Sequence, residues 1–168
     1  MPFDLHPEYP PEGIPRTDLL RRYGVDFHRN LQLSFEREGL VYNPPSEVVP
    51  NSHAALRLTE LARAQGVHAA THDRLMKAYW EDALNIGDPA VLAELANELD
   101  LVDADAAIVG DLHADEVAQS TARANSIGIN AIPAFVLDRR LIVLGAQPDD
   151  VFVRAFAQLD SAASEVSS

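Results

Sequence analysis

The sequence contains no cysteine among its 168 residues. This absence excludes disulfide bonds, zinc sites built from thiolates and any nucleophilic thiol, and it leaves the redox compartment undetermined. Basic residues are also scarce, because 13 Lys and Arg stand against 26 Asp and Glu, which gives a formal net charge of −13. A chain this acidic is a poor partner for nucleic acid, whose phosphates need cations, and for anionic membrane surfaces.

Long apolar runs are absent as well. No stretch of the sequence approaches the roughly 20 apolar residues of a membrane-spanning helix. The N-terminus carries prolines and acidic residues where a signal peptide needs basic residues and an apolar segment. There is no glycine-rich phosphate loop and no serine in a nucleophile-elbow motif. We therefore predict a cytoplasmic protein, and no cofactor is implied.

Apolar residues make up 47% of the chain, enough for the core of one domain with or without an insertion. Phe3 and Leu5 alternate with Asp4 and His6, which is the pattern of a half-buried strand. Apolar spacing, capping residues and glycine stops then predict helices over about 16–24, 26–38, 51–65, 88–99, 104–109, 113–127 and 151–159. They also predict a helix after Gly66 whose apolar face is Leu75, Met76, Tyr79, Trp80 and Ala83.

Some details of these helices are predicted too. Asn51 is expected to cap one helix, and Asp88 followed by Pro89 is a strong start signal for another. Within 26–38, the residues expected to face inward are Phe27, Leu31 or Leu33, and Phe35.

The stretch Ile129–Asp138 organises the rest of the chain. Its apolar run is separated by a short polar break from a second one, Leu141–Leu144, and this arrangement predicts a β-hairpin. Pro133 should stand at the start of the first strand, because proline cannot donate a ladder hydrogen bond. An X-Pro bond at such a place also tolerates the cis isomer.

The order helix, glycine, INAIPAFVLD, second strand, GAQP, helix resembles the C-terminal half of a thioredoxin-fold domain. More narrowly it resembles the DsbA-like family, and within it the FrnE-like branch of thiol–disulfide oxidoreductases. The matching segments elsewhere are Pro2–Pro7, Pro11–Gly13, Pro50–Ala54, Ala78–Trp80 and Asn85–Asp88.

This resemblance implies an α/β, thioredoxin-like fold with a helical insertion, mostly helical with a small sheet. It also implies that the Ile132–Pro133 bond is cis and that Pro133 faces the catalytic cysteines of the family. The backbone of Ile132 would then pair with an extended polypeptide or thiol substrate. Ile132 and Pro133 are therefore the predicted substrate-binding residues.

This chain departs from the family in one respect, and that departure limits the enzymatic activity that the resemblance implies. The family carries a Cys-X-X-Cys motif on its first helix, whereas this chain has no cysteine and is expected to begin after that strand and helix. Because thiol–disulfide exchange needs a thiolate, we predict an inactive chain with oxidoreductase ancestry. Two alternatives stay open: a cysteine-free binding module that uses the cis-proline surface, and a relative of glutathione-dependent isomerases or transferases whose catalytic residue lies on the missing segment.

The resemblance also predicts how the chain is divided. Residues 1–10 would be a remnant sheet strand, 11–111 a helical insertion domain, 112–160 the C-terminal half of the thioredoxin fold, and 161–168 a flexible tail. Because the missing strand is central in this fold, either residues 2–7 take its place beside the hairpin or another chain fills the gap. The second case predicts a homo-oligomer or a strand-complemented assembly.

Other candidate sites are weaker. His68 and His72 are four residues apart on a predicted helix, which is metal-ligand spacing, but Ala69 stands where a zincin needs its general-base Glu. We therefore predict surface histidines and no metal site. Tyr79 and Trp80 fall in an apolar helical stripe and are expected in the core. His113, with acidic residues after it, is interpreted as a helix start.

Overall fold

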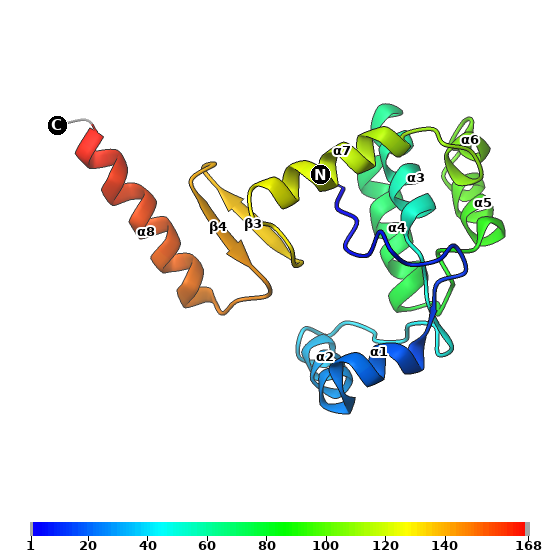
Figure 1. Ribbon diagram of the computed structural model, residues 1–168, viewed down its shortest axis with the longest axis horizontal. Helices are drawn as coiled ribbons and strands as arrows, with labels where there is room; N and C mark the ends of the chain where they lie inside the picture. The colour runs from blue at the N-terminus through cyan, green and yellow to red at the C-terminus, as the bar shows by residue number, and fades with distance from the viewer. Residues whose placement is uncertain (1, 167–168) are drawn as a thin grey trace. The chain divides into compact units, whose positions relative to one another are not determined.

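The computed structural model of the protein describes residues 2–166, and side chains of the last helix up to Ser161. The chain divides into two compact units, residues 1–120 and 121–168. In the described residues, the helices are α1 (Arg16–Tyr23), α2 (Val25–Arg37), α3 (His53–Ala64), α4 (His68–Trp80), α5 (Pro89–Glu98), α6 (Ala104–Ile108), α7 (Ala114–Ser126) and α8 (Asp149–Val166). The strands are β1 (Ile14–Pro15), β2 (Val48–Val49), β3 (Ala134–Leu137) and β4 (Leu141–Leu144) (Figure 1).

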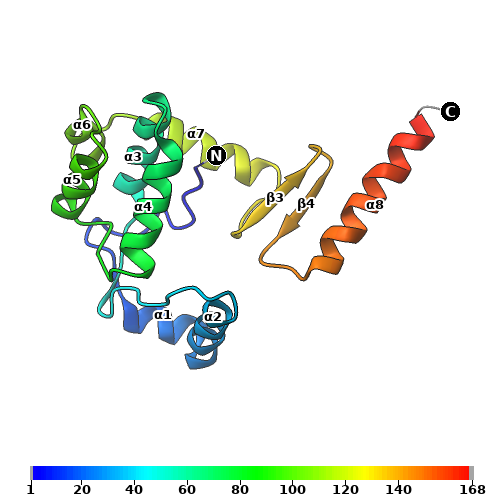
Figure 2. The same ribbon diagram turned by 180° about the vertical axis from the view of Figure 1, so that it is seen from behind.

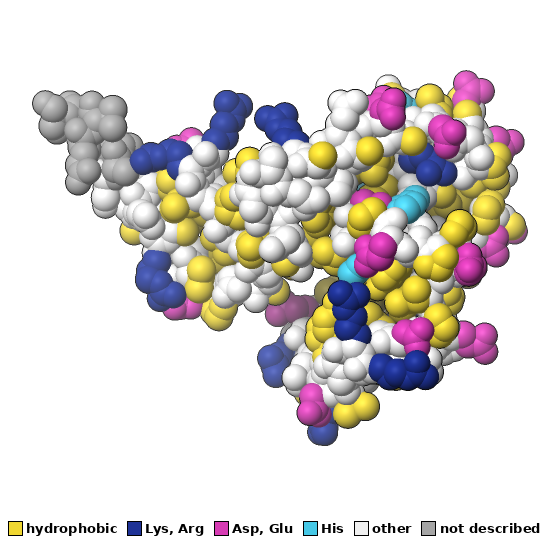
Figure 3. Space-filling model, viewed as in Figure 1, with side chains coloured by type: hydrophobic (Ala, Val, Ile, Leu, Met, Phe, Trp, Pro, Cys, Tyr) yellow, Lys and Arg dark blue, Asp and Glu magenta, His cyan; other side chains and the backbone are white. Residues whose placement is uncertain are grey.

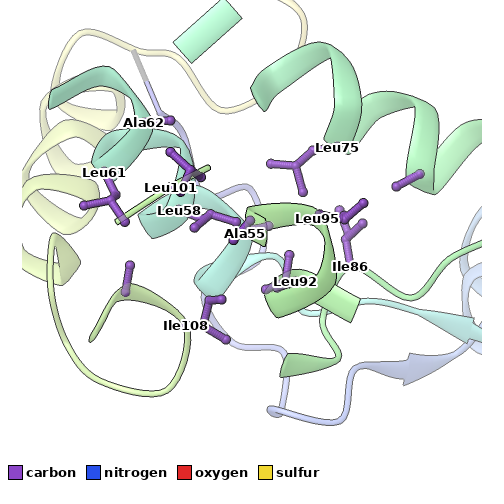
Figure 4. Packing of buried hydrophobic residues seen from close by; sticks show 13 residues of the cluster. Ala55, Leu58, Leu61, Ala62, Leu75, Ile86, Leu92, Leu95, Leu101 and Ile108 are labelled. Carbon is purple, nitrogen blue, oxygen red and sulfur yellow. The ribbon is translucent and has the colours of Figure 1, made fainter. Parts of the chain in front are cut away.

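The core of the first unit lies among α3, α4, α5 and α6. Leu58, Leu92 and Leu95 are at most 1% exposed and meet in its centre, where apolar side chains from all four helices converge (Figure 4). Tyr79 packs against this cluster, as the apolar stripe predicted. Burial of this apolar surface is the main force that holds the unit together.

The start of α5 agrees with the sequence signal. Asp88 is the N-cap residue, and its carboxylate accepts a hydrogen bond of 2.9 Å from the backbone N–H of Ala90, with Pro89 at the first helical position. The start of α3 differs by one residue. Ser52 occupies the N-cap position, while the side chain of Asn51 accepts from the N–H of His53 at 2.8 Å. Asn51 therefore still satisfies a backbone donor of the first turn.

The predicted strand over Phe3–Leu5 is wrong, because residues 2–10 form turns and irregular structure. Asp4 is only 9% exposed, so the expected alternation of buried and exposed residues is not present. Its carboxylate accepts from the N–H of His6 at 3.2 Å and lies 2.7 Å from Nε2 of His53, at the first residue of α3. These local and helix-terminal contacts compete with strand pairing, and prolines bracket the segment.

Helix α2 buries less than its sequence pattern predicted. None of its residues is fully buried, and Phe27 is 43% exposed. Phe35 is half-buried and contacts Tyr42 and Trp80, with ring centroids 5.2 and 4.8 Å away. An aromatic cluster, rather than a continuous apolar core, therefore joins α2 to the end of α4.

The second unit holds the predicted hairpin. Strands β3 and β4 pair antiparallel, with Ala134 opposite Leu144 and Leu137 opposite Leu141. The polar break after Leu137 turns the chain, and Asp138 and Arg139 there have φ of 49° and 55°. Both views of the fold show α8 beside this hairpin (Figure 2), and Phe152 of α8 meets Phe135 with ring centroids 5.0 Å apart.

The last helix is longer than predicted. It continues through Val166 instead of ending near Leu159. Most of the predicted tail 161–168 is thus helical, and residues 167 and 168 lie outside the described residues.

The sheet of this unit contains only β3 and β4 among the described strands, so no strand from residues 2–7 is added to it.

On the surface shown in Figure 3, acidic side chains are scattered over the helical unit, and basic ones stand singly rather than as a continuous stripe. This distribution gives nucleic acid no cationic surface to bind on that face. Of the helices in residues 2–166, none combines the length and the apolar character that a membrane crossing requires.

Candidate functional site

The end of α7 sets the position of the loop that contains Ile132 and Pro133. Gly128 has φ of 87°, a left-handed conformation that suits glycine. Its N–H donates to the carbonyl of Asn125 at 3.0 Å, and the N–H of Ile129 donates to that of Ala124 at 3.0 Å. These two bonds form a Schellman motif, and Ile129, which follows the glycine, is only 7% exposed.

The loop then leads into β3. The peptide bond between Ile132 and Pro133 is cis, the isomer that the sequence predicts. The carbonyl of Pro133 accepts a hydrogen bond of 2.7 Å from the N–H of Gly145, at the end of β4. The loop is therefore held between a capped helix and both strands of the hairpin.

Ile132 is the exposed residue of this loop. Its side chain is 56% exposed. Within residues 2–166, neither its backbone N–H nor its C=O has a hydrogen-bond partner. A backbone segment with both groups unpaired can accept an extended chain as an added strand.

Comparisons with known proteins agree with this geometry. The family model for the DSBA-like thioredoxin domain matches residues 1–157. This chain belongs to the DsbA-like thioredoxin family. It is 29% identical to the uncharacterized protein YwbO of Bacillus subtilis (strain 168), over 94% of this chain and 79% of that protein.

A solved structure is also similar. The crystal structure of the probable DsbA oxidoreductase SCO1869 from Streptomyces coelicolor matches with a TM-score of 0.81 and 31% identity. The match covers 93% of this chain and 72% of that chain. The fold is therefore the thioredoxin-like fold of DsbA proteins, mostly helical with small sheets.

The family chemistry depends on thiols, and this chain has none. A thiolate must attack a sulfur for exchange to occur. The loop that contains Ile132 and Pro133 therefore has no nucleophile for thiol–disulfide exchange.

The histidine pair considered from the sequence lies on α4. The rings of His68 and His72 are stacked with centroids 6.0 Å apart. Nη2 of Arg63 donates to Nε2 of His68 at 2.7 Å, so a cation already occupies the ligand nitrogen. Among the described residues, no group of three His, Cys, Asp or Glu is arranged to hold a metal ion.

The environment of His68 leads to a testable prediction about the pKa of its imidazole. Burial and the charge of Arg63 hold the pKa of the His68 imidazole below its usual value. Since folding disfavours the protonated ring, His68 contributes stability that falls as the pH drops below the pKa of the unfolded state. We expect Arg63→Gln to raise the pKa of His68, as followed by an NMR titration of the imidazole protons. The matched control is Arg21→Gln, since Arg21 is a surface arginine of α1 and should leave that pKa unchanged.

A polar cluster at the start of α3 was missed by the sequence reasoning. It combines the Asp4–His53 contact with the amide of Asn51, whose Nδ2 donates to the carbonyl of Tyr9 at 2.7 Å. His6 stacks on Tyr9 with ring centroids 4.4 Å apart. The sequence signal was the pair of polar residues Asp4 and His6 between apolar residues, which the strand interpretation placed on a solvent face. The cluster fastens the N-terminal segment to α3.

The remaining candidate, His113, lies where the sequence placed it. It stands directly before α7, with φ of 67°, and its Nδ1 is 3.3 Å from Oε1 of Glu116. A backbone hydrogen bond and His113 lower the pKa of the Glu116 carboxyl. This arrangement stabilises the helix start and contains no reactive geometry.

Proposed function

We propose that this chain is a FrnE-type member of the DsbA-like family that binds extended polypeptide or thiol-bearing substrates along Ile132 and, alone, performs no thiol–disulfide exchange. The observation that carries the proposal is the exposed Ile132, whose backbone N–H and C=O have no partner in residues 2–166. Family membership supports it, since DsbA-like proteins act on thiol substrates.

The hairpin next to this loop supports the same proposal. Phe135, Val136 and Ile142 are 40%, 45% and 39% exposed, which is high for large apolar residues of a sheet. An added strand would gain main-chain hydrogen bonds at Ile132 and apolar contacts from these side chains. The main-chain hydrogen bonds are independent of substrate sequence, and the apolar contacts favour apolar side chains, so the site suits unfolded polypeptides with exposed apolar residues.

The binding half of the proposal is tested with a thiol-free probe, reduced and carboxymethylated α-lactalbumin. We expect this probe to slow hydrogen exchange of the Ile132 amide, because pairing would protect it, and Ile132→Asp to weaken binding by about tenfold. Val153→Asp is the matched control, since Val153 is an exposed aliphatic residue of α8, at 67%. Equal binding by both variants, or an unprotected Ile132 amide in the complex, would contradict this role.

The chemical half is tested by insulin reduction with dithiothreitol. We expect the purified chain to leave the rate at that of the protein-free blank, because it supplies no thiolate. Thioredoxin serves as the positive control. A rate that rises in proportion to the concentration of the pure chain would refute the proposal of an inactive protein.

Two further features of the proposal rest on the sequence. The cytoplasmic location stays a prediction. Assembly into a homo-oligomer, or pairing of the hairpin with a strand of another chain, also stays a prediction, and the two-stranded sheet with its exposed apolar residues supports it. Light scattering on the purified chain measures its mass directly.

A further inference from the structure

A cavity of about 390 Å³ lies beside α1 in the first unit, bordered by α1, α2 and the segment that follows α2. Its lining combines apolar side chains with donors, among them Arg16, Thr17, Leu20, Pro44 and Ser46. None of the described residues that line it is Asp or Glu, although the chain has 26 acidic residues and a net charge of −13. The lining of the cavity is therefore positively charged, through Arg16, although the protein as a whole is acidic.

The positive charge belongs to Arg16, which is only 7% exposed. Nε donates to the carbonyl of Pro45, and Nη2 donates to the carbonyl of Val48 at 3.2 Å and to the hydroxyl of Tyr79 at 3.1 Å. All these acceptors are neutral, and no carboxylate of the described residues forms an ion pair with Arg16. A charge buried to this extent usually has an anionic partner, because removing it from water is costly.

One edge of the Arg16 guanidinium has no hydrogen-bond partner in the described residues. Nη1 of Arg16 has no hydrogen-bond partner within residues 2–166, and it is not among the fully buried atoms that lack one. It therefore keeps some contact with solvent, and Arg16 lines the cavity. Thr17 and Ser46 line the cavity too, and neither hydroxyl has a partner in the described part of the chain. Three uncommitted donors thus belong to residues that line the same space.

The other polar groups of the cavity add no negative charge. The Tyr42 hydroxyl lies 3.0 Å from Nδ1 of His28, and burial raises the pKa of Tyr42, so its phenol stays neutral at physiological pH. Leu20 and Pro44 supply an apolar wall. A carboxylate would meet the donors, and a short hydrocarbon chain would meet that wall.

We propose that this cavity binds a small organic carboxylate, with the carboxylate on Nη1 of Arg16 and the hydroxyls of Thr17 and Ser46. The single negative charge of a carboxylate matches the positive charge of Arg16, the one arginine among the described residues that line the cavity, and its oxygens accept several hydrogen bonds at once. The proposal concerns the first unit and is independent of the substrate role proposed for Ile132.

The test titrates the full chain with butyrate and follows backbone amide shifts by NMR. We expect saturable shifts in α1 and around Ser46 with a Kd of roughly 1–10 mM, as suits a small ligand held by one ion pair. Butyramide has the same shape without the charge and should bind at least about tenfold more weakly. Inorganic phosphate is the third probe, and it should also bind more weakly, because a single arginine balances only one negative charge.

Two pairs of variants separate the site from general charge effects. Thr17→Glu would place a carboxylate beside Arg16 and should weaken butyrate binding by about tenfold or more, whereas Thr17→Gln, which removes the hydroxyl but adds no charge, should weaken it by only about threefold. Arg16→Gln should abolish binding, and Arg21→Gln, a surface arginine of the same helix, should not change it. Because Arg16 also holds Pro45 and Tyr79, the Thr17 pair decides the outcome if Arg16→Gln fails to fold.

Three results would overturn the proposal. The first is the absence of saturable shifts up to about 50 mM butyrate, well above the expected Kd. The second is equal binding of butyrate and butyramide, or equal effects of Thr17→Glu and Thr17→Gln, since either would show that charge is irrelevant. The third is tighter binding of phosphate than of butyrate, which would assign the cavity to another class of anion.

Discussion

Replacing Leu58 with alanine is expected to lower the free energy of unfolding of the first unit by about 3 kcal/mol, within the range known for fully buried leucines. Leu58 is 0% exposed and lies on α3, the helix that contacts α4, α5 and α6. The loss combines the transfer free energy of the removed carbons with the cavity left behind. The packing of α3 against α4, α5 and α6 limits how far the surroundings can relax into this space.

The measurement is urea unfolding followed by tryptophan fluorescence. Trp80 is the only tryptophan of the chain and lies in the first unit, so its signal reports that unit alone. The matched control is Val109→Ala, since Val109 is 73% exposed and should shift the free energy of unfolding by less than about 0.5 kcal/mol. Equal losses for both variants would show that the core described around α3 is wrong.

Gly13→Ala is expected to destabilise the first unit by about 2–4 kcal/mol, through two separate causes. Gly13 has φ of 78°, a left-handed conformation that costs other residues about 1 kcal/mol or more. A Cβ at this position would also lie 2.4 Å from the carbonyl oxygen of Val49. That oxygen is backbone of β2, whose pairing with β1 begins directly after Gly13, so it cannot move away without opening the pair.

Gly66→Ala isolates the first cause from the second. Gly66 lies just after α3 with φ of 79°, close to that of Gly13, but no atom lies within 4 Å of the Cβ that would be added. We expect this variant to lose only about 1 kcal/mol. The difference between the two variants in urea unfolding then measures the steric contact with Val49. If the two losses are equal, the close approach of Gly13 to β2 has no energetic role.

Part of the candidate site could be predicted from the sequence. Two apolar runs split by a short polar break were enough to predict the hairpin, and Pro133 was enough to predict the strand start, because proline cannot donate a ladder hydrogen bond. Asp88 and Pro89 were likewise enough to predict the start of α5. The sequence could not predict that the backbone N–H and C=O of Ile132 are unpaired, since hydrogen-bond partners depend on which segments meet in space.

The errors have one physical origin. Phe3–Leu5 has strand periodicity, but the carboxylate of Asp4 is drawn to His53 at the start of α3, 49 residues later in the chain. Phe27 has the spacing of an inward-facing residue, yet it is 43% exposed, and its ring stacks on Tyr23 of the short helix α1 with centroids 4.9 Å apart. Periodicity shows which face of an element is apolar, and it does not show whether a partner covers that face.

By itself, the sequence determined the helices with strong caps, the hairpin after Pro133, and the absence of any thiol chemistry in this chain, because these depend on neighbouring residues or on composition alone. Only the tertiary structure decided that Asp4 is buried against α3, that Ile132 has unpaired backbone groups, and that Arg16 keeps one free edge in a cavity without acidic residues. These properties arise from contacts between segments distant in sequence, whose desolvation and pairing no local pattern specifies.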